Sequence, residues 1–221
     1  MNPEQFVDHA DDLIAIRHDL HMHPELQFEE FRTSKIVAEE LSRLGFKVTT
    51  GIAGTGVIGT LSNGASRRAI GIRADMDALP IHETTNLTYS SRTVGKMHAC
   101  GHDGHTTMLL GAARYLAETK NFDGTVHLIF QPAEEDVSGA KRMIEEGLFK
   151  RFPCDAVFAL HNIPGDETGQ ISVRPGAITA AVDIVEVTVQ GLGGHGALPH
   201  MAADPIVAAS GIVLALQSIV A

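Results

Sequence analysis

The sequence predicts an α/β protein followed by the start of a second, smaller domain. Helix-type segments alternate with short, continuously apolar segments between about residues 69 and 160, which is typical of strands buried on both faces. Near residue 183 the pattern changes, and residues 184–190 alternate apolar and polar side chains as a half-exposed strand does. The length of 221 residues is long for one domain and short for two.

The first elements follow from local signals. Asn2-Pro3 is typical of an N-cap followed by a first-turn proline, so we expect a helix from there to about residue 20. A second helix is expected over residues 29–44, with Gly45 as its stop. Asn63-Gly64 predicts a hairpin turn between the second and third of the strands that follow. These strands are expected at residues 46–50, 57–61 and 69–74.

The remaining elements alternate and then change character. A glycine-rich loop is expected over residues 191–196, and Asp204-Pro205 predicts the start of an apolar helix that runs to Ala221. Before residue 183 we expect helices at 104–118 and 138–146 and strands at 125–130 and 156–160.

The composition excludes several classes of protein. A formal net charge of −10 argues against a nucleic-acid or anionic-membrane surface, and no run of eighteen apolar residues predicts a membrane span. The first residues have neither the basic nor the apolar region of a signal peptide. Cys100 and Cys154 are therefore expected to stay reduced in the cytoplasm, although they could in principle pair.

Three predicted strands end at residues of the types that bind metals. The strand at 69–74 leads to Asp75 and Asp77, the strand at 125–130 to Glu134-Glu135, and the strand at 156–160 to His161. Sites in open α/β sheets form just beyond the carboxyl ends of strands, so we expect these side chains to converge.

Cys100-x-His102 lies in a segment that holds one thiol and three imidazoles within eight positions. Alternate residues of an extended loop point the same way, so both side chains could bind one ion. Alone, the pattern is more often a buried free cysteine beside solvent-facing histidines. Together with Glu135 and His161 it predicts Zn²⁺ or a neighbouring first-row ion, because thiolate and imidazole do not suit Ca²⁺ or Mg²⁺.

Glu134-Glu135 supplies two adjacent carboxylates. In extended backbone they would point in opposite directions, one to the metal and one to the substrate as general base. In isolation, with Asp136 following, the same residues would be interpreted as a solvated acidic loop.

Among the other histidines, only the role of His195 is left open, and the rest are expected to have structural roles. His195, among glycines in the second domain, is interpreted equally well as a donor to an oxyanion or as an exposed loop residue. The histidines at 18, 21 and 23 are expected to bond the last carbonyls of the first helix, and His105 to open the next helix. Ordinary surface or packing roles are expected for His9, His82, His127 and Cys154.

These motifs resemble the metal-dependent amidohydrolases. This family includes hippurate hydrolase, N-acyl-amino-acid amidohydrolases and auxin-conjugate hydrolases, and it is related to aminoacylase and carboxypeptidase G. The resemblance covers essentially the whole chain. It lies in the segments 71–80, 97–105, 130–135, 161–162 and 193–200.

The resemblance implies two divalent metal ions, Zn, Mn, Co or Ni, and hydrolysis of the amide of a small N-acyl amino acid. It makes Glu134 the general base that activates water and later protonates the leaving amine. It makes Asp77 an orienting residue behind the ligands, and His195 the residue that stabilises the tetrahedral intermediate, often in the site of a partner subunit. Asp75 stands where the wider family has a ligand histidine and is not expected to bind metal. The implied ligands are Cys100, His102, Glu135 and His161.

The resemblance also implies the domain organisation. It predicts a zinc-peptidase-like mixed sheet flanked by helices over residues 1–182, and the start of a small α+β lid or dimerisation domain over residues 183–221. A homo-oligomer through the lid is expected, with no nucleic-acid or membrane partner. Family members are longer, so the chain is expected to be a fragment or a truncated product that lacks the return of the catalytic domain and one further ligand histidine. As rivals, the same residues are compatible with a non-catalytic metal-binding, dimerising fragment or with a dipeptidase or carboxypeptidase.

Overall fold

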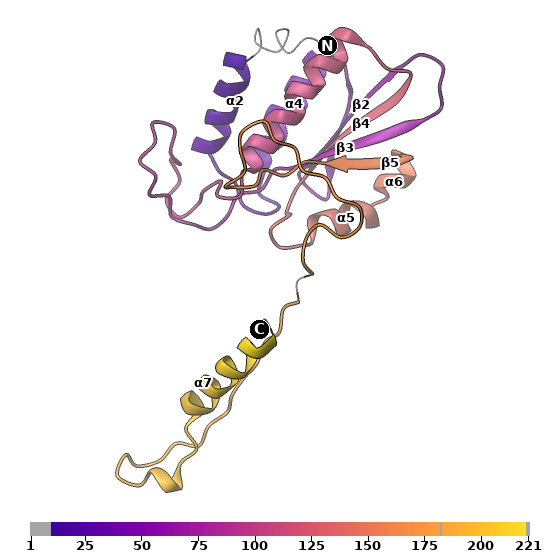
Figure 1. Cartoon of the computed structure of the whole chain (residues 1–221). Coiled ribbons are helices and arrows are strands. Elements are labelled where there is room, and N and C mark those ends of the chain that lie inside the picture. The colour runs from indigo at the N-terminus through magenta and orange to yellow at the C-terminus, as the bar shows by residue number, and fades with distance from the viewer. Residues whose placement is uncertain (1–9, 182, 220–221) are drawn as a thin grey trace. The chain divides into compact units, whose positions relative to one another are not determined.

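The computed structural model describes residues 10–181 and 183–219 and divides the chain into two compact units, Met1–Asp166 and Glu167–Ala221 (Figure 1). The expected start of the first helix at Asn2-Pro3 and the expected helix end at Ala221 lie outside the described residues. Within the described part of the chain, no helix is long and apolar enough to cross a membrane.

The first unit alternates helices and strands, as the sequence predicts. Its two N-terminal helices precede three strands, and from there on single strands and helices follow one another along the chain. Its elements are α2 (Ala10–Met22), α3 (Phe31–Arg43), β1 (Lys47–Ile52), β2 (Gly56–Asn63), β3 (Ala69–Asp75), α4 (His102–Thr119), β4 (Gly124–Gln131), α5 (Gly139–Glu145), α6 (Leu148–Arg151) and β5 (Ala156–Ala159).

The five strands form one mixed sheet in the order β1-β2-β4-β3-β5. β4 lies in the middle, antiparallel to β2 and parallel to β3. The predicted hairpin between β2 and β3 is therefore wrong: Gly64 does adopt a turn conformation with φ +73°, but β4 inserts between the two strands. The parallel register aligns Asp75 at the end of β3 with Gln131 at the end of β4.

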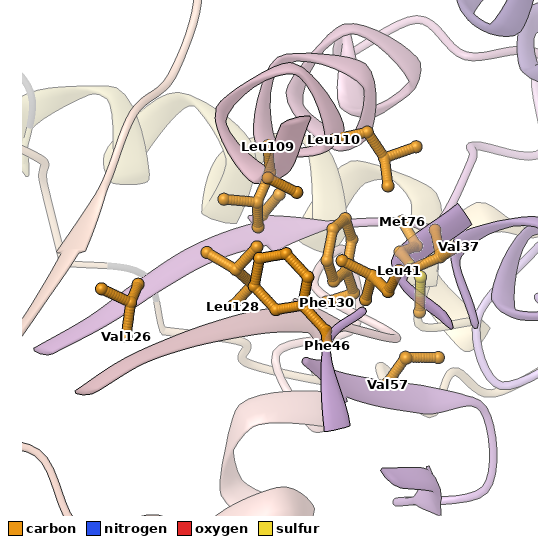
Figure 2. Close-up of a cluster of buried hydrophobic side chains, with 12 residues drawn as sticks. Val37, Leu41, Phe46, Val57, Met76, Leu109, Leu110, Val126, Leu128 and Phe130 are labelled. Carbon is orange, nitrogen blue, oxygen red and sulfur yellow. The ribbon is translucent and has the colours of Figure 1, made fainter. Parts of the chain in front are cut away.

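Apolar side chains fill both faces of the sheet. On one face, α3 lies against β1 and β2, and α4 against β3 and β4. The apolar cluster there includes Leu41, Leu110, Leu128 and Phe130, all completely buried (Figure 2). On the other face, Ile58 and Ile129 pack with Met143 of α5 and Leu148 of α6. The central strands are thus buried on both sides, which explains their continuous apolar sequence.

β5 departs from this expectation, because all four of its residues are exposed. It pairs with β3 alone and forms an edge of the sheet. Its apolar sequence still forms a strand because the parallel ladder to β3 satisfies one side of its backbone.

Gly45 ends α3 as predicted. The N–H of Phe46 donates to the carbonyl of Leu41, and the N–H of Gly45 donates to the carbonyl of Ser42, both at 3.0 Å. This pair of hydrogen bonds requires a residue in the left-handed conformation, and Gly45 has φ +83°. The turn directs Phe46 back into the core beside Leu41.

The second unit contains η1 (Pro199–Met201), α7 (Pro205–Leu216) and η2 (Gln217–Ile219). Asp204 caps α7 as predicted, since its Oδ1 accepts from the N–H of Ile206 at 2.8 Å. The strand expected over residues 184–190 is wrong: these residues pair with nothing in the described part of the chain, and the unit's one isolated bridge joins Leu192 to Ala203. An alternating sequence forms a strand only where another strand completes its hydrogen bonds.

Candidate metal centre

The candidate site lies at the carboxyl edge of the sheet. β3 ends at Asp75, and the chain reaches Asp77 two residues later, while the turn after β4 carries Glu134 and Glu135. The chain leaves β5 at Ala159 and reaches His161. Parallel pairing of β4 and β5 with β3 brings these three segments together, as the sequence predicts.

His102 lies at the start of α4 and is completely buried. Its Nδ1 donates to the main-chain carbonyl of Asp77 at 2.8 Å, so this nitrogen carries the proton. In the neutral imidazole, the form that binds metals, the other ring nitrogen, Nε2, presents a lone pair. It lies 3.6 Å from Oδ2 of Asp75, 3.8 Å from Oε1 of Glu135 and 4.0 Å from Oε2 of Glu134. A backbone-anchored imidazole of this kind is typical of a metal ligand.

Two of these facing atoms are buried and have no hydrogen-bond partner: Nε2 of His102 and Oε1 of Glu135. When His102 is neutral both atoms are acceptors and cannot bond each other, and leaving them desolvated is costly. A cation between them removes that cost. The donor set therefore fits a metal ion.

Cys100 and His161 complete the predicted set. Sγ of Cys100 lies 3.5 Å from Nε2 of His161. Cys100, His102 and His161 each offer a ligand atom within 4.8 Å of the other two, and so do His102, Glu134 and Glu135. His102 belongs to both groups, which is the arrangement that could hold one ion or an adjacent pair.

The charges at the site are uncompensated within the protein. Burial raises the pKa of the Cys100 thiol to about 12, and the negative charge of Glu135 adds to this rise. Burial also raises the pKa of Glu135, against the attraction of His102. Burial is the main cause of both shifts and the neighbouring carboxylates add to them, and a nearby divalent cation would favour the ionised forms.

A third possible group consists of Asp75, His102 and His105. Asp75, however, already has protein partners: Nδ1 of His105 lies 2.6 Å from its Oδ1, and Nη1 of Arg73 lies 2.6 Å from its Oδ2. Burial opposes its ionisation, but the His105 hydrogen bond and the Arg73 charge hold the pKa of Asp75 down at about 2. That Asp75 does not bind the metal stays a prediction, since its Oδ2 also lies 3.6 Å from Nε2 of His102.

Asp77 acts on two ligand segments at once. Its main-chain carbonyl accepts from His102, and its Oδ2 accepts from the N–H of Glu135 at 3.0 Å. This geometry fits the expected orienting role.

The acidic pair lies in a turn, not in the extended backbone that the sequence argument assumed. Ala133 has φ +50°, and residues 134–137 form turns. Both carboxylates therefore reach His102. The Glu134 side chain is 40% exposed and the Glu135 side chain 18%, so Glu134 is the more accessible to a substrate.

His105 and Asn162 were missed as site residues. His105 does not open α4 but lies buried within it, and its Nε2 is 2.5 Å from Oδ1 of Asn162. Gly101 has φ +93°, which favours glycine, and a Cβ there would lie 2.3 Å from the same Asn162 oxygen. The spacing of His102 and His105 within one helical turn was the available signal.

The histidines around the first helix have different roles. His23 bonds the carbonyl of Asp19 at 2.8 Å, as expected for a helix end. His18 instead stacks on Tyr89 at 3.8 Å between ring centroids. For His21 the helix-end expectation is wrong, because its ring is buried between two carboxylates, 2.8 Å from Asp103 and 3.2 Å from Glu83.

The remaining candidates have other surroundings or belong to the second unit. His195 is in the second unit, where its Nδ1 accepts from the N–H of Ala197 at 3.1 Å, and its role stays a prediction. His127 bonds Thr60 on the neighbouring strand at 2.9 Å. His82 is exposed, Cys154 is partly buried, and His9 lies outside the described residues.

The fold and the ligand cluster define an α/β protein with a candidate metal centre at the carboxyl edge of its sheet. Residues 71–218 match peptidase family M20/M25/M40, and the chain belongs to this family.

Three relatives have informative names. The chain is 50% identical to hippurate hydrolase from Campylobacter jejuni over 216 residues, which cover 98% of this chain and 56% of that protein. It is 47% identical to IAA-amino acid hydrolase ILR1-like 2 from Arabidopsis thaliana (99% and 48%) and 43% identical to thermostable carboxypeptidase 1 from Saccharolobus solfataricus (95% and 54%). The chain thus spans about half the length of the curated relatives it matches.

A solved structure supports the same conclusion. The Bacillus subtilis YXEP protein, a dinuclear metal-binding peptidase from the M20 family, superposes with a TM-score of 0.72 at 42% identity. The match covers 75% of this chain and 47% of that chain.

The buried position of His21 predicts pH-dependent stability. The hydrogen bond to Asp103 raises the pKa of His21, burial opposes this, and Glu83 adds to the rise. Arg17 shares the Asp103 carboxylate at 3.0 Å, and the His98 ring lies 6.4 Å away. The folded protein favours protonated His21, so this group stabilises the fold. The stabilisation is complete below pH 6.5, the ordinary histidine pKa, and is lost as the pH rises through the raised pKa of His21 in the folded protein.

We expect His21→Gln to lower the free energy of unfolding most at acidic pH, with the deficit shrinking above pH 6.5. Urea denaturation of the metal-free chain between about pH 5 and 9 measures this difference in the free energy of unfolding. The exposed His82→Gln is the matched control. A deficit for His21→Gln that stays constant over this range would contradict the assignment.

Proposed function

We propose that this chain carries the metal-binding site of a hydrolase that cleaves the amide of N-acyl amino acids, such as hippurate, to a carboxylate and an amino acid. The observation that carries the proposal is the pair of unpartnered buried acceptors on His102 and Glu135 beside Cys100 and His161. The names of the two most similar relatives described above support the substrate class, because each denotes hydrolysis of an acylated amino acid.

Two divalent cations, Zn, Mn, Co or Ni, are the proposed cofactors. Cys100, His102, Glu135 and His161 would hold them, since a thiolate and two imidazoles favour these metals over Ca²⁺ and Mg²⁺. When bound, such ions supply Lewis-acid polarisation of the amide carbonyl and lower the pKa of water.

The chain's own residues have distinct roles in this proposal. Glu134, the more exposed carboxylate, takes the proton from the attacking water and delivers it to the leaving nitrogen. Asp77 holds His102 in the correct tautomer and fixes the backbone of Glu135. His195 donates a hydrogen bond to the developing oxyanion from the second domain.

The organisation of the protein completes the proposal. Residues 1–182 form the catalytic domain and residues 183–221 belong to a lid that joins two copies. A cytoplasmic location is supported by the two free cysteines and the acidic net charge of −10.

The general-base assignment predicts the behaviour of Glu134→Gln. We expect this variant to bind metal as the unchanged chain does but to lose about 10²- to 10⁴-fold in hippurate hydrolysis, because proton transfer lacks its acceptor. Activity with added Mn²⁺, Zn²⁺, Co²⁺ or Ni²⁺ and metal content by mass spectrometry are the measurements.

Two further variants serve as controls. Cys100→Ala should lose bound metal together with activity, whereas Glu145→Gln, an exposed acid on α5, should change neither. A fully active Glu134→Gln would refute the base. An unchanged chain that binds metal but hydrolyses nothing would favour the non-catalytic rival.

A carboxypeptidase or dipeptidase is the second candidate, favoured by the 43% identity to a thermostable carboxypeptidase. The N-acyl-amino-acid hydrolase and the dipeptidase differ in the substrate they accept: the first takes an acylated nitrogen, the second a free, charged amino terminus. We expect kcat/KM for hippurate to exceed that for an unblocked dipeptide such as glycylglycine, because an acyl group replaces the charged amine. Faster hydrolysis of the dipeptide would reverse the assignment.

The proposed association of copies predicts a dimer. α7 exposes Ile206, Val207 and Leu214, each at least 70% accessible, and charge is absent from its sequence. Such a surface favours burial against another chain. We expect size-exclusion chromatography with light scattering to give twice the chain mass. A monomer at all concentrations tested would contradict this prediction.

A further inference from the structure

Glu30 is a completely buried carboxylate outside the ligand set. It stands at the N-terminus of α3, and its two oxygens bond two other segments. Oε2 accepts from the hydroxyl of Thr55, in the turn between β1 and β2, at 2.5 Å. Oε1 accepts from the main-chain N–H of Ala133, in the turn after β4, at 2.9 Å. Both partners are buried, so no water replaces these bonds.

The turn that Glu30 reaches is under conformational constraint. Ala133 directly precedes Glu134 and has φ +50°, a left-handed conformation that a residue with a Cβ rarely adopts. The carbonyl of Ala133 accepts from the N–H of Gly139 at 2.9 Å. A Cβ on Gly139 would lie 1.7 Å from the carbonyl oxygen of Pro132, so the chain closes on itself tightly here. Such a conformation persists only where its surroundings determine it.

Two buried carboxylates thus hold this turn from opposite ends. Glu30 binds the amide of Ala133, and Asp77 binds the amide of Glu135. Between these two anchored amides lies Glu134. The directions of the Glu134 and Glu135 side chains toward His102 therefore depend on both anchors.

We infer that Glu30 is a positioning residue for the acidic pair. It fixes the left-handed turn at Ala133, and through that turn it sets Glu134 and Glu135 against His102, although it is more than 100 positions away in the sequence. This inference rests on the proposed function insofar as the positioned groups serve a metal ion.

Two substitutions at Glu30 separate positioning from charge. Glu30→Met keeps the length of the side chain but offers no acceptor to Ala133. Glu30→Gln can keep both bonds, since its oxygen accepts from Ala133 and its amide donates to the hydroxyl of Thr55. We expect Glu30→Met to weaken Co²⁺ binding about 10- to 100-fold, as loss of an outer-sphere support does, and Glu30→Gln to restore it.

Titration of the metal-free 221-residue chain with Co²⁺ alone, followed by its visible absorption, measures the affinity and reports the ligand geometry. Leu41→Ala is the matched control, because Leu41 is equally buried but lies near the C-terminal end of α3, whereas Glu30 stands at its N-terminus. It should lower the unfolding midpoint without changing the Co²⁺ affinity or spectrum.

The outcomes discriminate between the two proposals. Glu30→Met binding Co²⁺ as tightly as the unchanged chain, or Leu41→Ala losing as much affinity, would overturn the positioning role alone. An unchanged chain that binds no Co²⁺ would overturn the proposed function and this inference together.

A second measurement applies if Glu30→Met does not fold. Hydrogen exchange of the unchanged chain and of Glu30→Gln should show a protected Ala133 amide in both, with protection that increases when Co²⁺ is added. An Ala133 amide that exchanges at the rate of an unprotected one, or that does not respond to Co²⁺, would overturn the inference.

Discussion

The hydrogen bond from His102 to the main-chain carbonyl of Asp77 is the interaction on which the site depends. A carbonyl can only accept, so the bond assigns a proton to Nδ1, and in the neutral ring Nε2 then keeps its lone pair. Because the bond runs to backbone and not to a side chain, the end of β3 and the start of α4 fix the ring together. The whole ligand set is then built around an imidazole that cannot rotate away without breaking the connection between two elements.

Charge compensation separates the acidic residues of the site into two kinds. Asp75 is neutralised by Arg73 and lies against His105, so its charge is satisfied by the protein. Glu134 and Glu135 face Nε2 of His102 and have no lysine or arginine partner among the described contacts. The protein neutralises Asp75 but supplies no lysine or arginine to the acidic pair, so a cation from solution would stabilise Glu134 and Glu135 more than it would Asp75.

The sequence predicted the parts of this arrangement that local patterns encode. The end of α3 at Gly45, the central apolar strands and the convergence of strand ends all follow from features within a few residues. The pairing of strands that are distant in the sequence does not follow from such local features. The turn at Gly64 was identified, but which strand would pair with β2 depended on β4, some 60 residues later. The same holds for residues 184–190, because an alternating pattern predicts a strand but does not predict which strand pairs with it.

Glu30 and His21 share one property: each stands at a helix end, where local chemistry already accounts for its residue type. Glu30 resembles an ordinary acid at a helix N-terminus, where the helix dipole alone would account for it. Its decisive partner is the main-chain amide of an alanine, and any non-proline residue supplies such an amide. His21 likewise occupies a helix end that would explain a histidine on its own, until the fold places Asp103 and Glu83 against both ring nitrogens. Local chemistry therefore gave each residue a sufficient explanation, and only the three-dimensional structure showed that a second interaction was present.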